Sequence, residues 1–318
     1  MKKRSTLLII VSLFILSLSA FAQDAQEVTK APYVEDFEKA KELAAAGNKP
    51  IIIDFYTDWC SWCKKFDKEV MTTDKAIDYF TNDVVMAKVN AEVDTALAQK
   101  FGVKGFPTFV LTSSSGEEID RVTGYLPVDD FIKTMSDYQR GIGTLQAVLD
   151  DALKNEDRSL YYKLADKYKY RGDSENARLW FDKILSGADK DSLSGEASMA
   201  IADMMRRNKK DDEAMAAYKQ IIVDYVGTDF EGKGMLYVGH SHRRVKEFGN
   251  AIEAYNSVME KYKGLQFAEE AELYIAITYR DKGDTALAIT AYDNFVKNWP
   301  ESEDVGYANK QVRKLRGE

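Results

Sequence analysis

The sequence DFYTDWCSWCK, residues 54–64, holds the two cysteines of this 318-residue chain. It directly follows a short apolar, β-branched run, Ile51–Ile53, which is typical of a buried strand. Cys60 then stands at a turn where a helix is predicted to begin. Orphan N–H groups and the positive end of the helix dipole stabilise an anion there, and the thiolate is the reactive form of cysteine. We therefore expect Cys60 to be acidic, exposed and nucleophilic, and Cys63 to resolve the mixed disulfide that Cys60 forms.

Two other uses of a cysteine pair fit this sequence less well. A structural staple across a four-residue loop would add little stability. A zinc site needs further ligands, but the chain has no second cysteine pair, and its two histidines, His240 and His242, are far away in sequence. Residues two apart on a helix do not share a face, so those histidines are not expected to bind a metal together. The pattern favours redox chemistry without a metal or other cofactor.

Residues 1–22 are typical of a secretory signal. Lys2–Arg4 form a positive end, Leu7–Leu18 an apolar core, and Ala20–Ala22 a cleavage site with small residues at both ends. A single membrane anchor is the alternative, but the apolar core is short for a span of ~20 residues. We expect the signal to be cleaved, the protein to be exported to the periplasm or a similar compartment, and no membrane span to remain.

The charge balance bears on the partners. The chain has 44 basic and 52 acidic side chains, a net charge of −8, and removal of Lys2–Arg4 with the signal would leave 41 against 52. An acidic chain of this kind is not expected to bind nucleic acid. Disulfides persist outside the cytosol, so an exported chain with a lone Cys-x-x-Cys pair is expected to exchange electrons with protein disulfides. Because no other cysteine is present, a redox partner must regenerate the pair.

Apolar strands and helical segments alternate around the cysteine segment, which predicts an α/β sheet. The helices are expected at Glu35–Ala46, at the cysteines, at Thr95–Phe101 and at Val128–Tyr138. The strands are expected from Ile51, at Val84–Asn90, at Gly105–Leu111 and at Ile119–Val122.

This region, about residues 33–139, resembles the thioredoxin fold. The pattern DFYxxWCxxCK at residues 54–64 and the later GFPT at residues 105–108 together carry the resemblance. The sequence DWCxxCK, followed by Phe66 and the acidic Asp67, is similar to the C-terminal periplasmic domain of the DsbD electron-transfer proteins. Ser61–Trp62 stands between the cysteines, where thioredoxin itself usually has Gly-Pro.

The resemblance implies roles around the two cysteines, the first attacking and the second resolving. Pro107 takes the place of the family's cis-proline, which faces the disulfide. It would expose the backbone of Phe106 to pair with an extended substrate segment. Trp59 would pack beside the site and shield it. Trp62, placed between the cysteines, is expected on the exposed rim rather than in the core.

The resemblance also implies a charged group behind the cysteines. Asp54 matches the family's buried acid, whose raised pKa suits it to take the proton from Cys63. Lys88 matches the lysine that pairs with that acid, and Asp67 matches a second acid of the DsbD-like subgroup. Each residue also has an ordinary structural interpretation. Asp54 could be a hydrogen-bonded carboxylate at a strand end, Lys88 a solvated charge on a strand, and Asp67 an acid on a helix surface.

After Gly141–Gly143, a predicted hinge, the pattern is helical throughout. Small, aromatic and large apolar residues each recur every 37 positions, and a fixed period kept over four copies predicts a helical repeat array. The array resembles the tetratricopeptide repeat, with Pro300 placed as the family's closing proline. The family period is about 34, so we expect loops longer by about three residues. The recurring positions are Ala177, Ala214, Ala251 and Ala288; Phe181, Tyr218, Tyr255 and Tyr292; and Ile184, Ile221, Val258 and Phe295.

The expected organisation is a signal at 1–22, a thioredoxin-like domain at 23–140, and about four tetratricopeptide-like repeats at 141–318. A bridging helix is expected at Thr144–Leu153 and a capping helix at Glu303–Arg316. The predicted function is exported thiol–disulfide oxidoreduction, in the reducing direction that the DsbD-like resemblance implies, with the repeat groove recruiting a protein ligand. A disulfide oxidase or isomerase, and a repeat scaffold with a secondary redox role, are the alternatives.

Overall fold

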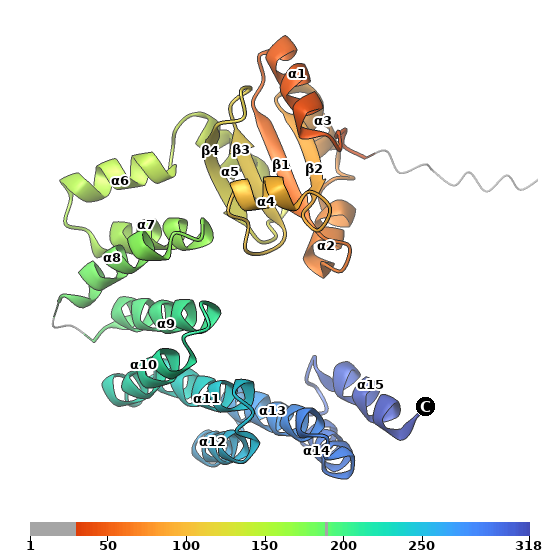
Figure 1. Ribbon diagram of the computed structural model, residues 1–318, viewed down its shortest axis with the longest axis vertical. Coiled ribbons are helices and arrows are strands. Elements are labelled where there is room, and N and C mark those ends of the chain that lie inside the picture. The colour runs from red at the N-terminus through yellow and green to blue at the C-terminus, as the bar shows by residue number, and fades with distance from the viewer. Residues whose placement is uncertain (1–29, 188–189) are drawn as a thin grey trace, which may run out of the picture.

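The computed structural model describes residues 30–187 and 190–318. It consists of an α/β domain followed by a helical array (Figure 1). This agrees with the fold class expected from the sequence. The expected signal at residues 1–22 lies outside the described residues. Within the described part, no helix combines the length and the apolar character that a membrane crossing requires.

The α/β domain is built on a four-stranded mixed sheet with the order β2-β1-β3-β4. The central strand β1, which leads into the cysteine segment, pairs in parallel with β2 and antiparallel with β3, and β3 pairs antiparallel with β4. Neighbours on both sides satisfy the backbone of β1, so its carboxyl end is firmly placed. The strands are β1 Ile51–Tyr56, β2 Val85–Asn90, β3 Thr108–Thr112 and β4 Glu118–Thr123.

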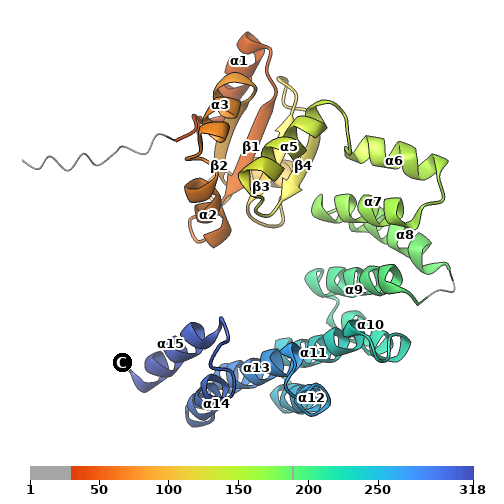
Figure 2. The same cartoon turned by 180° about the vertical axis from the view of Figure 1, so that it is seen from behind.

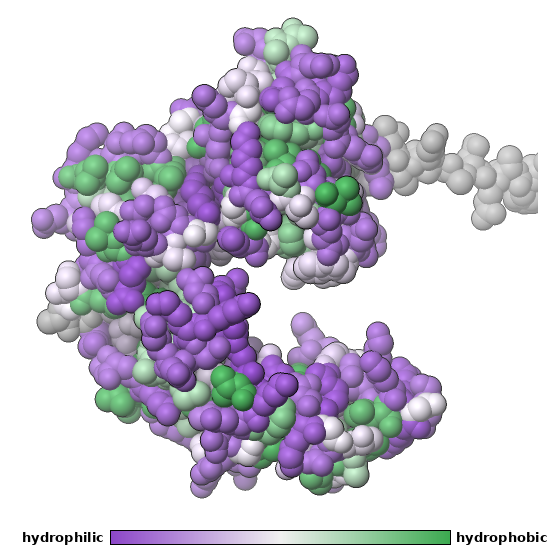
Figure 3. Space-filling model, viewed as in Figure 1, coloured by the Kyte–Doolittle hydropathy of each residue, from purple (hydrophilic) through white to green (hydrophobic). Residues whose placement is uncertain are grey.

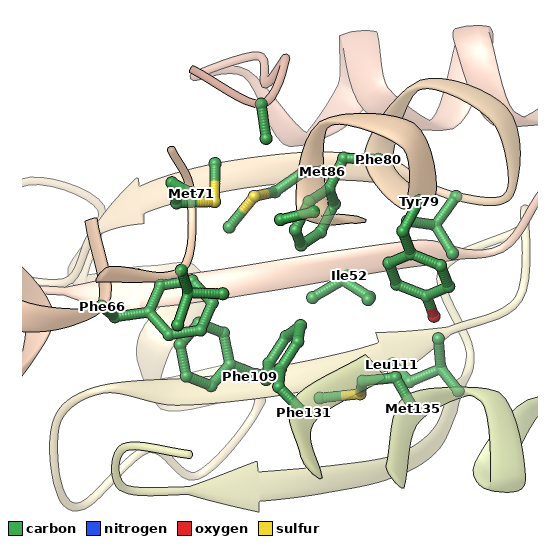
Figure 4. Close-up of a cluster of buried hydrophobic side chains, with 14 residues drawn as sticks. Ile52, Phe66, Met71, Tyr79, Phe80, Met86, Phe109, Leu111, Phe131 and Met135 are labelled. Carbon is green, nitrogen blue, oxygen red and sulfur yellow. The ribbon is translucent and has the colours of Figure 1, made fainter. Parts of the chain in front are cut away.

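Helices cover both faces of this sheet, so the isoleucine run is buried on both sides. Ile52 points to the face covered by α2, α3 and α5, where it packs with Phe66 and Phe131 (Figure 4). Ile51 and Ile53 point to the opposite face, under α1 and α4. A strand buried on both faces is apolar at every position rather than at every second one. The helices are α1 Phe37–Gly47, α2 Ser61–Glu69, α3 Asp74–Asn82, α4 Thr95–Lys100 and α5 Val128–Gln139.

The structure corrects the expected elements in three places. Helix α3 was not expected; Thr73 caps its start, with its hydroxyl accepting from the backbone N–H of Ala76 at 3.3 Å. The helix expected from Glu35 begins only at Phe37, because the Asp36 side chain is its N-cap. The strand expected from Gly105 begins at Thr108, because proline cannot donate to a sheet ladder and Pro107 directly precedes it.

The remainder of the described chain is a curved array of helices, in which α7 with α8, α9 with α10, α11 with α12, and α13 with α14 pack as consecutive pairs. Helix α15 packs on α14 and closes the array, and α6 bridges it to the α/β domain. The curvature brings α15 back below the α/β domain (Figures 1 and 2). The helices are α6 Leu145–Lys154, α7 Arg158–Tyr170, α8 Ser174–Leu185, α9 Ser192–Arg207, α10 Asp211–Asp224, α11 Asp229–Arg244, α12 Phe248–Lys261, α13 Gln266–Lys282, α14 Thr285–Asn298 and α15 Val305–Arg316.

The residues that recur every 37 positions are buried, and all lie on the second helix of each pair. A second periodic feature was not recognised from the sequence. Gly195 and Gly232, also 37 apart, lie against the rings of Phe230 and Phe267. A Cβ added at Gly195 would come within 2.4 Å of the Phe230 ring, and one at Gly232 within 2.7 Å of the Phe267 ring. Each ring therefore packs on bare helix backbone of the preceding repeat.

The predicted hinge at Gly141–Gly143 is bridged by a buried charge network. Asp120 on β4 is fully buried. Its carboxylate accepts from the backbone N–H of Leu145 at 2.5 Å, from Lys167 Nζ at 2.9 Å and from Arg171 at 2.8 Å. These bonds join the edge of the sheet to α6 and α7, so the two parts of the chain are attached through more than the glycine segment.

Candidate redox site at the start of α2

Cys60 and Cys63 form a disulfide with a Cα–Cα distance of 5.3 Å. Cys60 is the N-cap of α2, and its sulfur accepts the backbone N–H of Cys63 at 3.1 Å. The sulfur thus takes the place of the oxygen that caps most helices. When the disulfide is opened, the same N–H and the positive end of the helix favour negative charge on this sulfur.

The expectation that Cys60 is exposed is wrong for this disulfide form. Cys60 retains 4% of its accessible surface and Cys63 retains 5%. The disulfide and the N–H bond turn the Cys60 sulfur into the first turn of α2 rather than toward solvent. The neighbouring indoles are the exposed groups, with 66% for Trp59 and 53% for Trp62.

The exposed indoles are held in place on both sides of the disulfide. Trp59 Nε1 donates to Glu92 Oε1 at 2.9 Å, and its ring lies edge-on to the Phe106 ring at 5.8 Å. The Trp62 ring lies 5.8 Å from that of Tyr125. Because their partners come from other loops, these aromatic rings form a fixed apolar rim around the cysteines rather than a mobile surface.

The Phe106–Pro107 peptide bond is cis. It lies just before β3, and Thr108 at the start of β3 pairs with Phe55 near the end of β1. The cis peptide is therefore at the same sheet edge as the cysteine segment. The Pro107 carbonyl accepts from the backbone N–H of Gly124 at 2.8 Å, which holds this loop to the segment after β4.

Asp54 lies on β1 with 2% exposure, opposite Lys88 on β2. Its Oδ2 is 3.3 Å from Lys88 Nζ, and its Oδ1 has no hydrogen-bond partner among the described residues. Burial raises the pKa of Asp54 to about 6; Lys88 opposes this rise and the charge of Asp67 adds to it. A buried carboxyl with a raised pKa and an oxygen that has no hydrogen-bond partner among the described residues is suited to proton transfer.

Lys88 connects Asp54 to the second predicted acid. Its Nζ also forms an ion pair with Asp67 on α2. Burial disfavours the lysine charge, but Asp54 and Asp67 outweigh burial, so the pKa of Lys88 is raised. The Nζ lies 5.2 Å from the Tyr56 ring centre and 5.6 Å from that of Tyr33, two contacts that no sequence motif indicated. Lys88 is therefore not a solvated lysine, and Asp67 is not an isolated surface acid.

The two histidines lie in the array, far along the chain from this site. His240 Nδ1 is 2.7 Å from the Tyr255 hydroxyl, while His242 Nδ1 is 2.6 Å from Glu247 Oε2. The described residues contain no group of three or more side chains that could hold a metal ion.

Comparison with known proteins finds matches in both parts of the chain. A family model described as a thioredoxin-like domain matches residues 37–139. Residues 37–139 form a thioredoxin-like domain. A model described as a tetratricopeptide repeat matches residues 196–227 and 270–302 of the array. The resemblance expected from residues 54–64 and 105–108 is therefore confirmed, as is the repeat class expected from the 37-residue period.

Similar curated proteins are named thiol:disulfide interchange protein DsbD. The protein from Yersinia pestis is 35% identical over 96 residues, which cover 29% of this chain and 16% of that protein. The protein from Salmonella typhimurium strain LT2 is 33% identical over 129 residues, covering 39% of this chain and 22% of that protein. The match thus spans a minor part of these relatives. Together with the Cys60–Cys63 pair, it supports thiol–disulfide oxidoreductase chemistry for the thioredoxin-like domain.

Solved structures that match part of this chain include a mutant thioredoxin from Halobacterium salinarum NRC-1. It is 28% identical, with a TM-score of 0.28, and the match covers 34% of this chain and 90% of that one. Another is the DsbD C-terminal domain of Neisseria meningitidis in the oxidised form. It is 19% identical, with a TM-score of 0.30, and the match covers 34% of this chain and 99% of that one.

Proposed function

We propose that this protein is an exported thiol–disulfide oxidoreductase that reduces disulfides of other exported proteins. The observation that carries the proposal is the placement of the Cys60 sulfur at the N-cap of α2, with the Cys63 N–H bonded to it. The signal-like residues 1–22 and the named function of the DsbD relatives support export and the redox class.

The reaction begins with the reduced pair. The Cys60 thiolate attacks one sulfur of the substrate disulfide, a mixed disulfide forms, and the other substrate sulfur leaves as a thiolate. Cys63 then loses its proton and attacks the Cys60 sulfur. The mixed disulfide breaks, the second substrate thiolate leaves, and two electrons have passed from the cysteine pair to the substrate. A dithiol donor, which we assign to a membrane electron-transfer partner, must reduce Cys60–Cys63 again.

The buried charged group serves the second half of this reaction. Asp54 accepts the Cys63 proton. Two features suit it to this role: burial raises its pKa to about 6, and its Oδ1 has no hydrogen-bond partner among the described residues. Lys88 and Asp67 are positioning residues: Lys88 holds Asp54 from β2, and Asp67 holds Lys88 from the helix that carries Cys63. Trp59, Trp62, Phe106 and Pro107 supply the rim against which the substrate lies.

Measurements of activity, of trapped intermediates and of redox potential test this function. The wild-type protein should catalyse insulin reduction by dithiothreitol, and Cys60→Ser should abolish it. Cys63→Ser should accumulate mixed disulfides through Cys60, since resolution is blocked. If Cys63 proves to be the thiol that alkylates first and Cys60 is inert, the assigned roles are wrong. A Cys60–Cys63 reduction potential of about −270 mV would favour the reducing direction, and one of about −120 mV would favour an oxidase.

A further inference from the structure

A cleft of about 540 Å³ separates the thioredoxin-like domain from the array. The domain contributes Lys104, Gly105 and Thr123, and the array contributes Tyr170 and several arginines. A second hollow of about 630 Å³ continues along α11, and Arg206 and Arg244 line both. Figure 3 shows the molecule hollowed here, with hydrophilic side chains gathered over the end of α9 that faces the opening.

One end of the cleft lies beside the redox site. Gly105 directly precedes the cis Phe106–Pro107 peptide. Thr123, at the end of β4, has its hydroxyl 3.3 Å from that of Thr108, the first residue of β3. A substrate segment that lies along Phe106 to meet Cys60 therefore enters the cleft within a residue or two.

The lining of both hollows is positively charged, although the chain as a whole has a net charge of −8. Carboxylates compensate only part of this charge. Asp203 forms ion pairs with both Arg206 and Arg207. Lys169 pairs with Asp166, Arg243 with Asp281, and Arg244 with Asp211. The fifth acid, Glu270, lines the second hollow. Five acids thus face seven bases, and Lys104 and Lys246 have no ion pair with any described residue. The bases are Lys104, Lys169, Arg206, Arg207, Arg243, Arg244 and Lys246.

We propose that this cleft binds an extended, acidic segment of the protein whose disulfide reacts with Cys60. The inference rests on the proposed function and specifies its substrate. Arginine presents a planar fork that matches carboxylates, and arginine with tyrosine is the composition typical of protein interfaces. The acidic remainder of the chain repels such a segment elsewhere, so the charge pattern selects one docking position as well as one partner chemistry.

The test uses two synthetic peptides that share one intramolecular disulfide. One carries a ten-residue tail rich in Glu and Asp, and the other carries the same tail with Gln and Asn. The measured quantity is the ratio of kcat/KM for the two peptides within each protein variant, so that a general change in activity cancels. For the wild type at low ionic strength we expect a preference of about tenfold for the acidic tail. Salt at about 0.5 M should reduce that preference by screening.

Charge reversal locates the binding surface. The variant K104E/R207E/K246E should lower the preference to about one or below. The matched control K154E/K219E/K297E makes the same change of charge at exposed lysines that line neither hollow, and it should keep the preference. Circular dichroism establishes that both variants are folded. Equal rates for the two peptides with the wild type, or equal losses in both variants, would overturn the inference.

A binding measurement separates this inference from the redox function. A fluorescein-labelled acidic peptide without cysteine should bind the oxidised wild-type protein, with anisotropy showing at least tenfold weaker binding to K104E/R207E/K246E. If this binding occurs but neither disulfide peptide is reduced, the proposed redox function fails and the acidic-segment site stands. If a 12-nucleotide single-stranded DNA binds more tightly than the acidic peptide, the assignment to an acidic protein segment is wrong.

Discussion

Replacing Asp54 by Asn is expected to make the protein more stable and less active. The folded-state pKa of Asp54 is about 6, against a reference value of 3.8, and burial is the main cause. Each pKa unit corresponds to about 1.36 kcal/mol, so the ionised carboxylate costs about 3 kcal/mol in the folded state. This figure already includes the attraction of Lys88. An amide of the same shape carries no charge and escapes the cost.

The size of the effect depends on pH. Between about pH 4 and pH 6 the folded protein binds more protons than the unfolded chain, so stability from this group falls as the pH rises through that range. Well below pH 3.8 Asp54 is protonated in both states and contributes no difference. Asp54→Asn should therefore raise the free energy of unfolding by about 3 kcal/mol at pH 7 and by little at pH 3. Urea unfolding of the disulfide form at the two values measures this.

The same substitution should slow release of the mixed disulfide more than its formation. Release requires Cys63 to lose a proton, and loss of a positioned general base typically costs ~100-fold or more. Stopped-flow kinetics resolves the two steps. Asp67→Asn is the matched control, because it also removes a carboxylate partner of Lys88. The Asp67 side chain retains 38% of its accessible surface, so its charge costs little and the substitution should not stabilise the protein. The reasoning would be refuted if Asp54→Asn were less stable than the wild type at pH 7. It would also be refuted if formation and release of the mixed disulfide were slowed equally.

Three further outcomes are expected. Gly232→Ala should destabilise the protein by about 1–3 kcal/mol, because the added Cβ meets an aromatic ring. Gly249→Ala places its Cβ in open space and should stabilise the protein by up to about 1 kcal/mol. Equal shifts of the melting temperature would contradict the packing argument. A fragment ending at residue 140 should stay folded by circular dichroism and reduce small disulfides, because both cores of the α/β domain come from residues 31–138; an unfolded fragment would show that the array is structural support. Asp120→Ala should cost about 3–5 kcal/mol in the full chain, where it leaves Lys167 without its carboxylate partner and Arg171 with Glu118 alone, but little in that fragment. Equal urea-unfolding losses would place the role of Asp120 inside the domain.

The parts predictable from the sequence are those with local signals. The isoleucine run is apolar at each position because it is buried on both faces, and Cys60 follows it at a helix start, so strand, turn and helix could be placed together. The 37-residue period could be recognised because every repeat buries an Ala and, one helical turn later, an aromatic residue. The Gly195 and Gly232 positions follow the same period and could have been found by the same comparison.

The parts that could not be predicted depend on contacts between distant segments. The Asp54 and Lys88 pairing rests on the register of β1 against β2, for which residue types alone are a weak guide; the resemblance supplied it. The ion pair of Asp67 with Lys88 depends on the angle at which α2 leaves the sheet. Asp120 is one acid among many in the sequence, and its partners Lys167 and Arg171 are 47 and 51 residues further on.

The attachment at Asp120 also determines what the array can do for the redox site. If the glycine hinge alone joined the two parts, the array would be flexibly tethered to the thioredoxin-like domain. A segment bound to the array would then sample many positions, and its effective concentration at the redox site would be low. Here α7 is joined to β4 through Asp120, and the Arg171 carbonyl lies so close to Gly102 that a Cβ there would approach it to 2.7 Å. Gly102 belongs to the loop that leads to Phe106 and Pro107. The array is therefore docked against the segment that presents the substrate-binding rim, so its basic surface is held where a segment leaving that rim must pass.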